Sequence, residues 1–196
     1  ANGQAVITGI VSGVILIAGW NFWNSYQQDK MQQASSLYDQ LLVAVLQKKN
    51  ESVTKLAEQI ESKFDSTPYS FYSELFDART KVQAGDLEGA KQVLTKVMTE
   101  SSGELQHVAR IRLIRLLMAQ GEYEQGLQII SEVDQSSANT FIGNYEELKG
   151  DLYAAMDRPG EARTAYQNAL REGYSSPLLQ LKMDDLTPSE LVENKS

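Results

Sequence analysis

Apolar residues fill the first stretch of the chain, from Ala5 to Trp23, and no charged residue occurs before Asp29. In a helix, about twenty residues at ~1.5 Å each match the ~30 Å hydrocarbon core of a bilayer. The pattern therefore predicts one membrane-spanning helix. Two alternatives are weaker. A buried core helix rarely needs so long an uncharged run, and a cleaved signal peptide needs a basic residue before the run and small residues at its end.

Aromatic side chains gather at one end of this stretch, at Trp20, Phe22, Trp23 and Tyr26. Amphipathic rings of this kind lie at headgroup level and fix the depth of a membrane helix. We therefore expect this interfacial belt to face the compartment that holds the rest of the chain. The predicted anchor occupies residues 1–28.

Small residues lie on one face of the predicted anchor, at Gly9, Ser12 and Gly13. Such a face lets a second membrane helix, or a second copy of this one, pack closely. Because glycine is common in membrane helices, a specific helix partner and ordinary composition stay equal alternatives. The flanking charges do not orient the helix, since Asp29 and Lys30 cancel.

Downstream of the anchor, residues 29–196 show apolar positions at helical spacing and many strong helix formers. A repeat of 36 residues underlies them, because Gly85-Asp86-Leu87-Glu88-Gly89-Ala90 aligns with Gly121-Glu122-Tyr123-Glu124-Gln125-Gly126. A fixed period of this size is typical of stacked helical units. The sequence thus predicts an all-α chain, with breaks near 49–50, 66–68, 84–86, 101–103, 120–121, 136–139, 157–160 and 173–177.

The residues within each unit indicate its type. Gly150, Tyr153, Ala162, Tyr166 and Ala169 alternate small and aromatic side chains in the spacing of the tetratricopeptide repeat. Small residues would let the two antiparallel helices approach closely. The predicted α-solenoid has units at 33–66, 69–102, 105–138 and 141–174, with a capping helix at 176–186. A helical hairpin array of another geometry is the alternative.

The first helix of each unit would line the concave side of such an array. Counting from the small residues gives a mainly apolar wall with two arginines at equivalent places, which suits extended segments with apolar side chains and a carboxylate. The predicted groove residues are Tyr72, Leu75, Arg79, Val82, Val108, Ile111, Arg115 and Met118, followed in the last unit by Asn144, Glu147, Asp151 and Ala154. Packing against neighbouring helices is an equal alternative for Leu75 and Ile111.

The amino-acid composition excludes several kinds of binding and catalytic site. Lys and Arg number 18 against 26 Asp and Glu, so clustered cations for nucleic acid are not expected. Without cysteine, disulfides and thiolate chemistry are excluded. The one histidine, His107, is most often a surface residue or one satisfied by a neighbour in this setting. We expect no enzyme activity, no cofactor and no metal site.

The segment GIVSGVILIAGWNFWNSYQ, followed by helical repeats and a closing LLQLKMDDL, resembles the YfgM family. Its most specific part is Gly19-Trp20-Asn21-Phe22-Trp23. The resemblance implies a single-pass inner-membrane protein of Gram-negative bacteria with a cytoplasmic N-terminus and a periplasmic tetratricopeptide domain. It also implies attachment to the SecYEG translocon and partnership with the periplasmic chaperone PpiD.

Two functional hypotheses from different classes follow. The first is a membrane-anchored adaptor that links the translocon to chaperones or emerging chains. The second is a self-associating envelope scaffold unrelated to secretion, for which the chain could form a homodimer.

Overall fold

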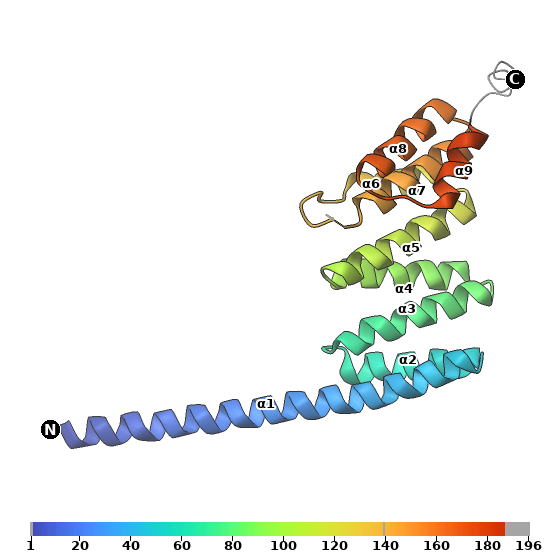
Figure 1. The fold of residues 1–196 in the computed structure, drawn as a ribbon. Coiled ribbons are helices and arrows are strands. Elements are labelled where there is room, and N and C mark those ends of the chain that lie inside the picture. Colours follow the sequence, from blue (N-terminus) through green and yellow to red (C-terminus); the bar gives the residue numbers. More distant parts are fainter. Residues whose placement is uncertain (1, 139, 187–196) are drawn as a thin grey trace, which may run out of the picture. The chain divides into compact units, whose positions relative to one another are not determined.

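The computed structural model describes residues 2–138 and 140–186, and of the first helix it describes the side chains of residue 3 and of residues from 13 onward. The described residues form nine helices and no strand, which confirms the all-α prediction (Figure 1). The helices are α1 (Asn2–Leu46), α2 (Asn50–Phe64), α3 (Pro68–Gln83), α4 (Leu87–Glu100), α5 (Glu104–Gln120), α6 (Tyr123–Ser131), α7 (Ile142–Ala155), α8 (Pro159–Arg171) and α9 (Pro177–Asp185).

The chain divides between Gln83 and Ala84 into two compact units. Unit 1 contains α1, α2 and α3, and unit 2 contains α4 to α9. The predicted repeat at 69–102 spans this division, so its two helices belong to different units.

Unit 1 is built on the second half of α1, which packs against α2 as an antiparallel hairpin. Its core joins Ala34, Leu41 and Ala44 of α1 to Ala57 and Ile60 of α2, all of them buried. The apolar residues of each helix recur three and four positions apart, which places them on the face toward the neighbour. The first helix is continuous from Asn2 to Leu46, with no break where the predicted anchor ends.

Unit 2 depends on small residues at the predicted close contacts. Ala90, Gly126 and Ala162, each 36 residues apart, are all buried. Between α7 and α8 the approach is close, because a methyl group placed at Gly150 would overlap the ring of Tyr166. Tyr166 therefore packs against α7 within its own hairpin, and it also contacts Leu179 of α9.

Most of the predicted breaks fall in the observed connections between helices. The predicted break at 136–139 also falls between α6 and α7, but the connection begins earlier than predicted, because α6 already ends at Ser131. Asp134 accounts for the difference, since its side chain accepts hydrogen bonds from Ser136 and its carbonyl accepts one from Ser137. Asp and Ser side chains compete in this way with helical hydrogen bonds. The result is a ten-residue connection, 132–141.

The Gly150 contact yields a stability prediction. Gly150→Ala should lower the free energy of unfolding by about 1–3 kcal/mol, because the buried Tyr166 ring must shift to admit the methyl group. The measurement is urea unfolding of the full chain in detergent, followed by circular dichroism.

Gly160→Ala is the matched control. It adds the same methyl group on α8, where no atom lies within 4 Å of the new carbon. This variant should unfold at the same urea concentration as wild type or a higher one. Equal losses in both variants would contradict the close-contact explanation.

Candidate functional site

The first half of α1 carries large apolar side chains that are exposed in the described part of the chain. Eight of them are between 46% and 76% exposed, namely Val14, Ile15, Leu16, Ile17, Trp20, Phe22, Trp23 and Tyr26. Trp23 and Tyr26 contact each other, with ring centroids 6.3 Å apart, and Lys30 lies over the Tyr26 ring. Contiguous exposed apolar surface of this kind marks an interaction site.

Among the residues that the structure describes, no helix meets the length and hydropathy required of a membrane span. The predicted span begins within residues 4–12, whose side chains lie outside the described residues. Gly9 and Ser12 of the predicted packing face fall there too. Gly13 is described, and apart from its own helix backbone no described atom lies within 4 Å of the position that its Cβ would occupy.

The predicted groove residues differ in their exposure. In unit 1, Tyr72, Arg79 and Val82 are exposed and Leu75 is buried. In unit 2, Arg115 is exposed and Ile111 is buried in the core that α5 shares with α7. Val108 and Met118 are half-buried. The side chains open to a partner are therefore the two arginines, Tyr72 and Val82.

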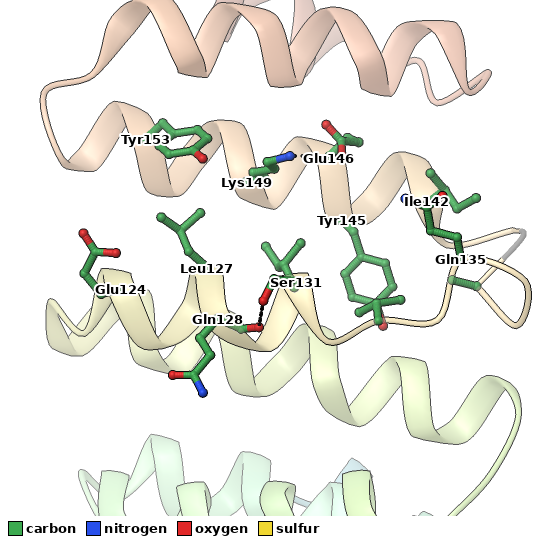
Figure 2. Close-up of a pocket in the computed structure, with 13 residues that line it drawn as sticks. Glu124, Leu127, Gln128, Ser131, Gln135, Ile142, Tyr145, Glu146, Lys149 and Tyr153 are labelled. Atoms are coloured by element: carbon green, nitrogen blue, oxygen red, sulfur yellow. Dashed lines mark hydrogen bonds and ion pairs between the residues drawn. The ribbon is translucent and has the colours of Figure 1, made fainter.

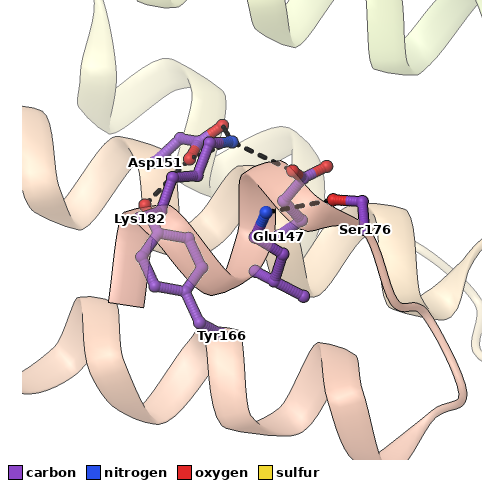
Figure 3. Close-up of polar contacts among 6 residues, drawn as sticks. Glu147, Asp151, Tyr166, Ser176 and Lys182 are labelled. Atoms are coloured by element: carbon purple, nitrogen blue, oxygen red, sulfur yellow. Dashed lines mark hydrogen bonds and ion pairs between the residues drawn. The ribbon is translucent and has the colours of Figure 1, made fainter. Parts of the chain in front are cut away.

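The last part of the predicted groove wall is covered by the chain itself. Lys182 of α9 donates hydrogen bonds to Glu147 and Asp151 of α7, at 2.9 and 2.8 Å (Figure 3). Tyr166 of α8 donates to the same Asp151 at 2.8 Å. Glu147 is only 4% exposed. The sequence prediction that Glu147 and Asp151 line an open groove is therefore wrong, because α9 lies over them.

Further contacts complete the position of α9. Leu179 is fully buried and packs with Ala162, Tyr166 and Ala169 of α8. Ser176 caps the helix by accepting a hydrogen bond from the Leu179 backbone at 3.0 Å. Arg163 donates to the carbonyl of Leu186. We call the surface formed by Glu147, Asp151, Ala162, Tyr166 and Ala169 the α9 seat.

Electrostatics at the α9 seat favour a bound cation. Burial alone would lower the pKa of Lys182, but its hydrogen bonds to Asp151 and Glu147 and their charges outweigh burial and raise that pKa. Burial and the hydrogen bond to Asp151 raise the pKa of Tyr166. Lys182 is therefore charged and Tyr166 protonated at neutral pH.

A cleft of about 610 Å³ lies between α6 and α7 (Figure 2). Its apolar part comes from Leu127, Ile130, Val133, Ala138, Ile142 and Tyr145, and its polar part from Glu124, Gln128, Ser131, Gln135, Glu146 and Lys149, with Tyr153 at one end. The early end of α6 at Ser131 leaves room for it. A smaller cleft between α7 and α8 shares Lys149 and Tyr153 with the first, so both belong to one surface.

His107 holds the long connection 132–141 against α5 and α7. It is 1% exposed, its Nδ1 lies 2.9 Å from the Tyr145 hydroxyl, and its Nε2 lies 3.2 Å from the Ser137 carbonyl. A carbonyl only accepts, so Nε2 carries the hydrogen and Tyr145 donates to Nδ1. The ring stacks on Phe141, with centroids 5.0 Å apart. This histidine is satisfied by its neighbours, which is one of the two outcomes expected for it.

The surroundings of His107 keep the ring neutral. Burial lowers its pKa, the hydrogen bond to Ser137 opposes that effect, and the charge of Arg110 lowers the pKa further. Protonation of Nδ1 would also reverse the hydrogen bond from Tyr145. Such a ring serves structure rather than proton transfer, and no cluster of three metal-binding side chains occurs among the described residues.

Sequence reasoning missed two features of this domain. The α6–α7 cleft follows from the early end of α6, for which Asp134-x-Ser136 is a local signal. The α9 seat joins Lys182 to residues 31 and 35 positions earlier, and helical periodicity carries no information about such a pair.

Comparison with known proteins agrees with these observations. A family profile described as tetratricopeptide repeat-like domain matches residues 1–188. The chain belongs to this tetratricopeptide repeat-like family. The match covers α1 as well as all the later helices, so the long first helix is part of the family pattern.

Three relatives of this tetratricopeptide-like protein share one name, ancillary SecYEG translocon subunit. The Escherichia coli (strain K12) protein is 28% identical over 191 residues, covering 95% of this chain and 90% of the relative. The Haemophilus influenzae protein is 24% identical over 187 residues, covering 94% and 90%. The Aggregatibacter actinomycetemcomitans protein is 26% identical over 173 residues, covering 87% and 83%. The resemblance to the YfgM family is confirmed.

The buried histidine yields a pH prediction for the tetratricopeptide-like domain. The pKa of His107 is lower in the folded chain than its usual value near 6.5, so below about pH 6.5 the unfolded chain binds a proton that the folded chain does not. Stability should therefore fall as the pH drops below about 6.5, and His107→Gln should remove this part of the loss.

The free energy of unfolding is measured for wild type and for His107→Gln from pH 7.5 to 5.5, and the difference between the two proteins is taken at each pH. The carboxylates are the same in both proteins, so their contribution cancels in this difference. Because His107 is the only histidine in the sequence, the difference belongs to it. Parallel curves would contradict the burial argument.

Proposed function

We propose that this protein is a membrane-anchored adaptor that associates with the SecYEG translocon through its anchor or its tetratricopeptide-like domain. The observation that carries the proposal is the similarity to three ancillary SecYEG translocon subunits over 87–95% of the chain. Similarity that runs through α1 and the repeats supports a shared arrangement of anchor and domain.

The anchor in this proposal is the first half of α1. Its apolar side chains from Val14 to Tyr26 are exposed, and the sequence continues the apolar run back to Ala5. In water this surface would be unfavourable, whereas in a bilayer each side chain gains a hydrocarbon environment. Trp20, Phe22, Trp23 and Tyr26 would then lie at the headgroup level.

In the proposed orientation the N-terminus is cytoplasmic and the domain is periplasmic, as the resemblance to the YfgM family implies. The anchor would bring the domain close to the site where chains leave the translocon. Tetratricopeptide-like helices stacked as a solenoid, with α9 as the terminal cap, would there hold a chaperone of the PpiD type or an emerging chain. The arginines Arg79 and Arg115 are exposed for such contacts.

No chemistry of its own is required of the protein in this role. The adaptor acts by raising the local concentration of its partners, because tethering turns a second encounter into an intramolecular one. The net charge of −8 would keep the domain away from anionic lipid, so that its surfaces stay accessible.

The anchor yields a localisation prediction. Replacing both Ile15 and Ile17 by Arg should release the protein from membranes at alkaline pH, while wild type stays in the membrane pellet. Each arginine near the centre of a membrane helix makes the free energy of insertion less favourable by about 2.5–3.5 kcal/mol. Leu46→Arg is the control, because Leu46 lies on the same helix beyond the proposed span and is exposed. Retention of the double variant would contradict the anchor.

The translocon association yields a crosslinking prediction. A photoreactive amino acid at Trp23 or at Arg115, in a Gram-negative host, should give adducts with translocon subunits or with a PpiD-type chaperone. The same probe at Ile60, which is fully buried, should give none. If the exposed positions give only adducts between copies of this chain, the self-associating scaffold replaces the adaptor.

A further inference from the structure

The α6–α7 cleft is a hollow that no described side chain fills. It runs along both helices, from Glu124 and Tyr153 at one end to Gln135 and Ile142 at the other (Figure 2). We propose that this cleft binds an extended segment of a partner protein, in which a large apolar side chain is flanked by lysine or arginine. The proposal goes beyond the translocon association and does not rest on it.

The shape of the cleft favours an extended segment over a helix. Ile142 and Tyr153 are eleven positions apart on α7, so the cleft is roughly 16 Å long at ~1.5 Å per residue. A volume of about 610 Å³ over this length gives a mean cross-section of roughly 40 Å². A helix with its side chains is ~10–12 Å across and needs about twice that area. Five extended residues at ~3.3 Å each match the length.

The apolar part of the cleft accommodates a large apolar side chain. Leu127, Ile130 and Val133 contribute from α6 and the connection that follows it, and Ile142 contributes from α7. All four are half-buried and pack at the edge of the core that α5, α6 and α7 share, so part of their apolar surface remains in water. A partner side chain that enters the cleft removes this surface from water, which is the main driving force of association.

The charges around the cleft favour a cationic partner. Surface carboxyl groups are ionised at neutral pH. Five carboxylates lie in the joined clefts or next to their lining residues, namely Glu124, Glu132, Asp134, Glu146 and Glu161. The cations described near them are Arg110, Lys149 and Arg158. The negative balance attracts lysine or arginine and disfavours a second copy of this chain, whose net charge is −8.

Glu124 is the carboxylate best placed to bind the cation of the partner. It is exposed, and its charge acts on Arg158. That arginine already donates hydrogen bonds to Glu161, at 2.9 and 2.6 Å. One cation is therefore shared by two carboxylates at this end of the cleft. Glu146 differs, because Lys149 lies 3.6 Å from it and neutralises it.

The test uses the full chain in detergent and three labelled peptides, rich in β-branched residues that favour an extended backbone. KVTFTVK matches the proposal, EVTFTVE reverses its charge, and KVTSTVK lacks its large apolar side chain. The first peptide should bind wild type about tenfold more tightly than either of the others. A photoreactive analogue of its central phenylalanine should form crosslinks within residues 123–153.

Two variants test whether the peptide occupies the cleft. Ser131→Tyr fills the cleft with a ring and should weaken binding of KVTFTVK about tenfold, whereas Ser62→Tyr should not change it. The two serines are matched, because both are exposed near the end of a helix and donate to the carbonyl three residues earlier. Glu124→Gln should weaken binding about threefold, and Glu58→Gln on α2 is its exposed control.

Four results would contradict the proposal. The first three are equal binding of the three peptides, equal effects of Ser131→Tyr and Ser62→Tyr, and crosslinks confined to α1. Wild-type dimers that KVTFTVK dissociates would assign the cleft to a second copy of the chain. Circular dichroism checks that each variant keeps its helices, and the crosslink to the wild-type chain requires no variant.

Discussion

The close contact between α7 and α8 is the constraint on which the C-terminal end of unit 2 depends. Gly150 lets the Tyr166 ring lie directly against α7, and this position brings the Tyr166 hydroxyl to Asp151. Asp151 in turn binds Lys182 and so helps to hold α9. A single missing methyl group thus determines where a phenol, a carboxylate and a neighbouring helix are placed.

A different interaction stabilises unit 2 beside α6, which is too short to cover α5 and α7 along their whole length. His107 replaces the missing helical contacts with two hydrogen bonds and a stacked ring, and it ties the 132–141 connection to α5 and α7. The cleft beside α6 exists because this connection follows its own turn, built on Asp134, instead of continuing the helix. A buried polar network therefore stabilises the connection between α6 and α7.

The periodic part of this architecture could be predicted from the sequence. The 36-residue repeat gave the helical hairpins, because small and apolar residues at fixed spacing report which faces must meet. The end of α6 was missed because one aspartate and two serines changed the local hydrogen bonding. The groove prediction failed at Glu147 and Asp151, since nothing in the repeat reports that Lys182, outside the repeats, would cover them.

The continuity of α1 has a mechanical consequence. The helix that carries Trp20 and Trp23 also carries Ala34, Leu41 and Ala44, which are buried in the core of unit 1, and no glycine or proline interrupts it between Gly19 and Leu46. With its first half held in lipid as proposed, the helix has no hinge at the membrane surface. A change in tilt within the bilayer would turn the first hairpin through the same angle, so movements of neighbouring membrane helices would reach unit 1 as a rotation of α1.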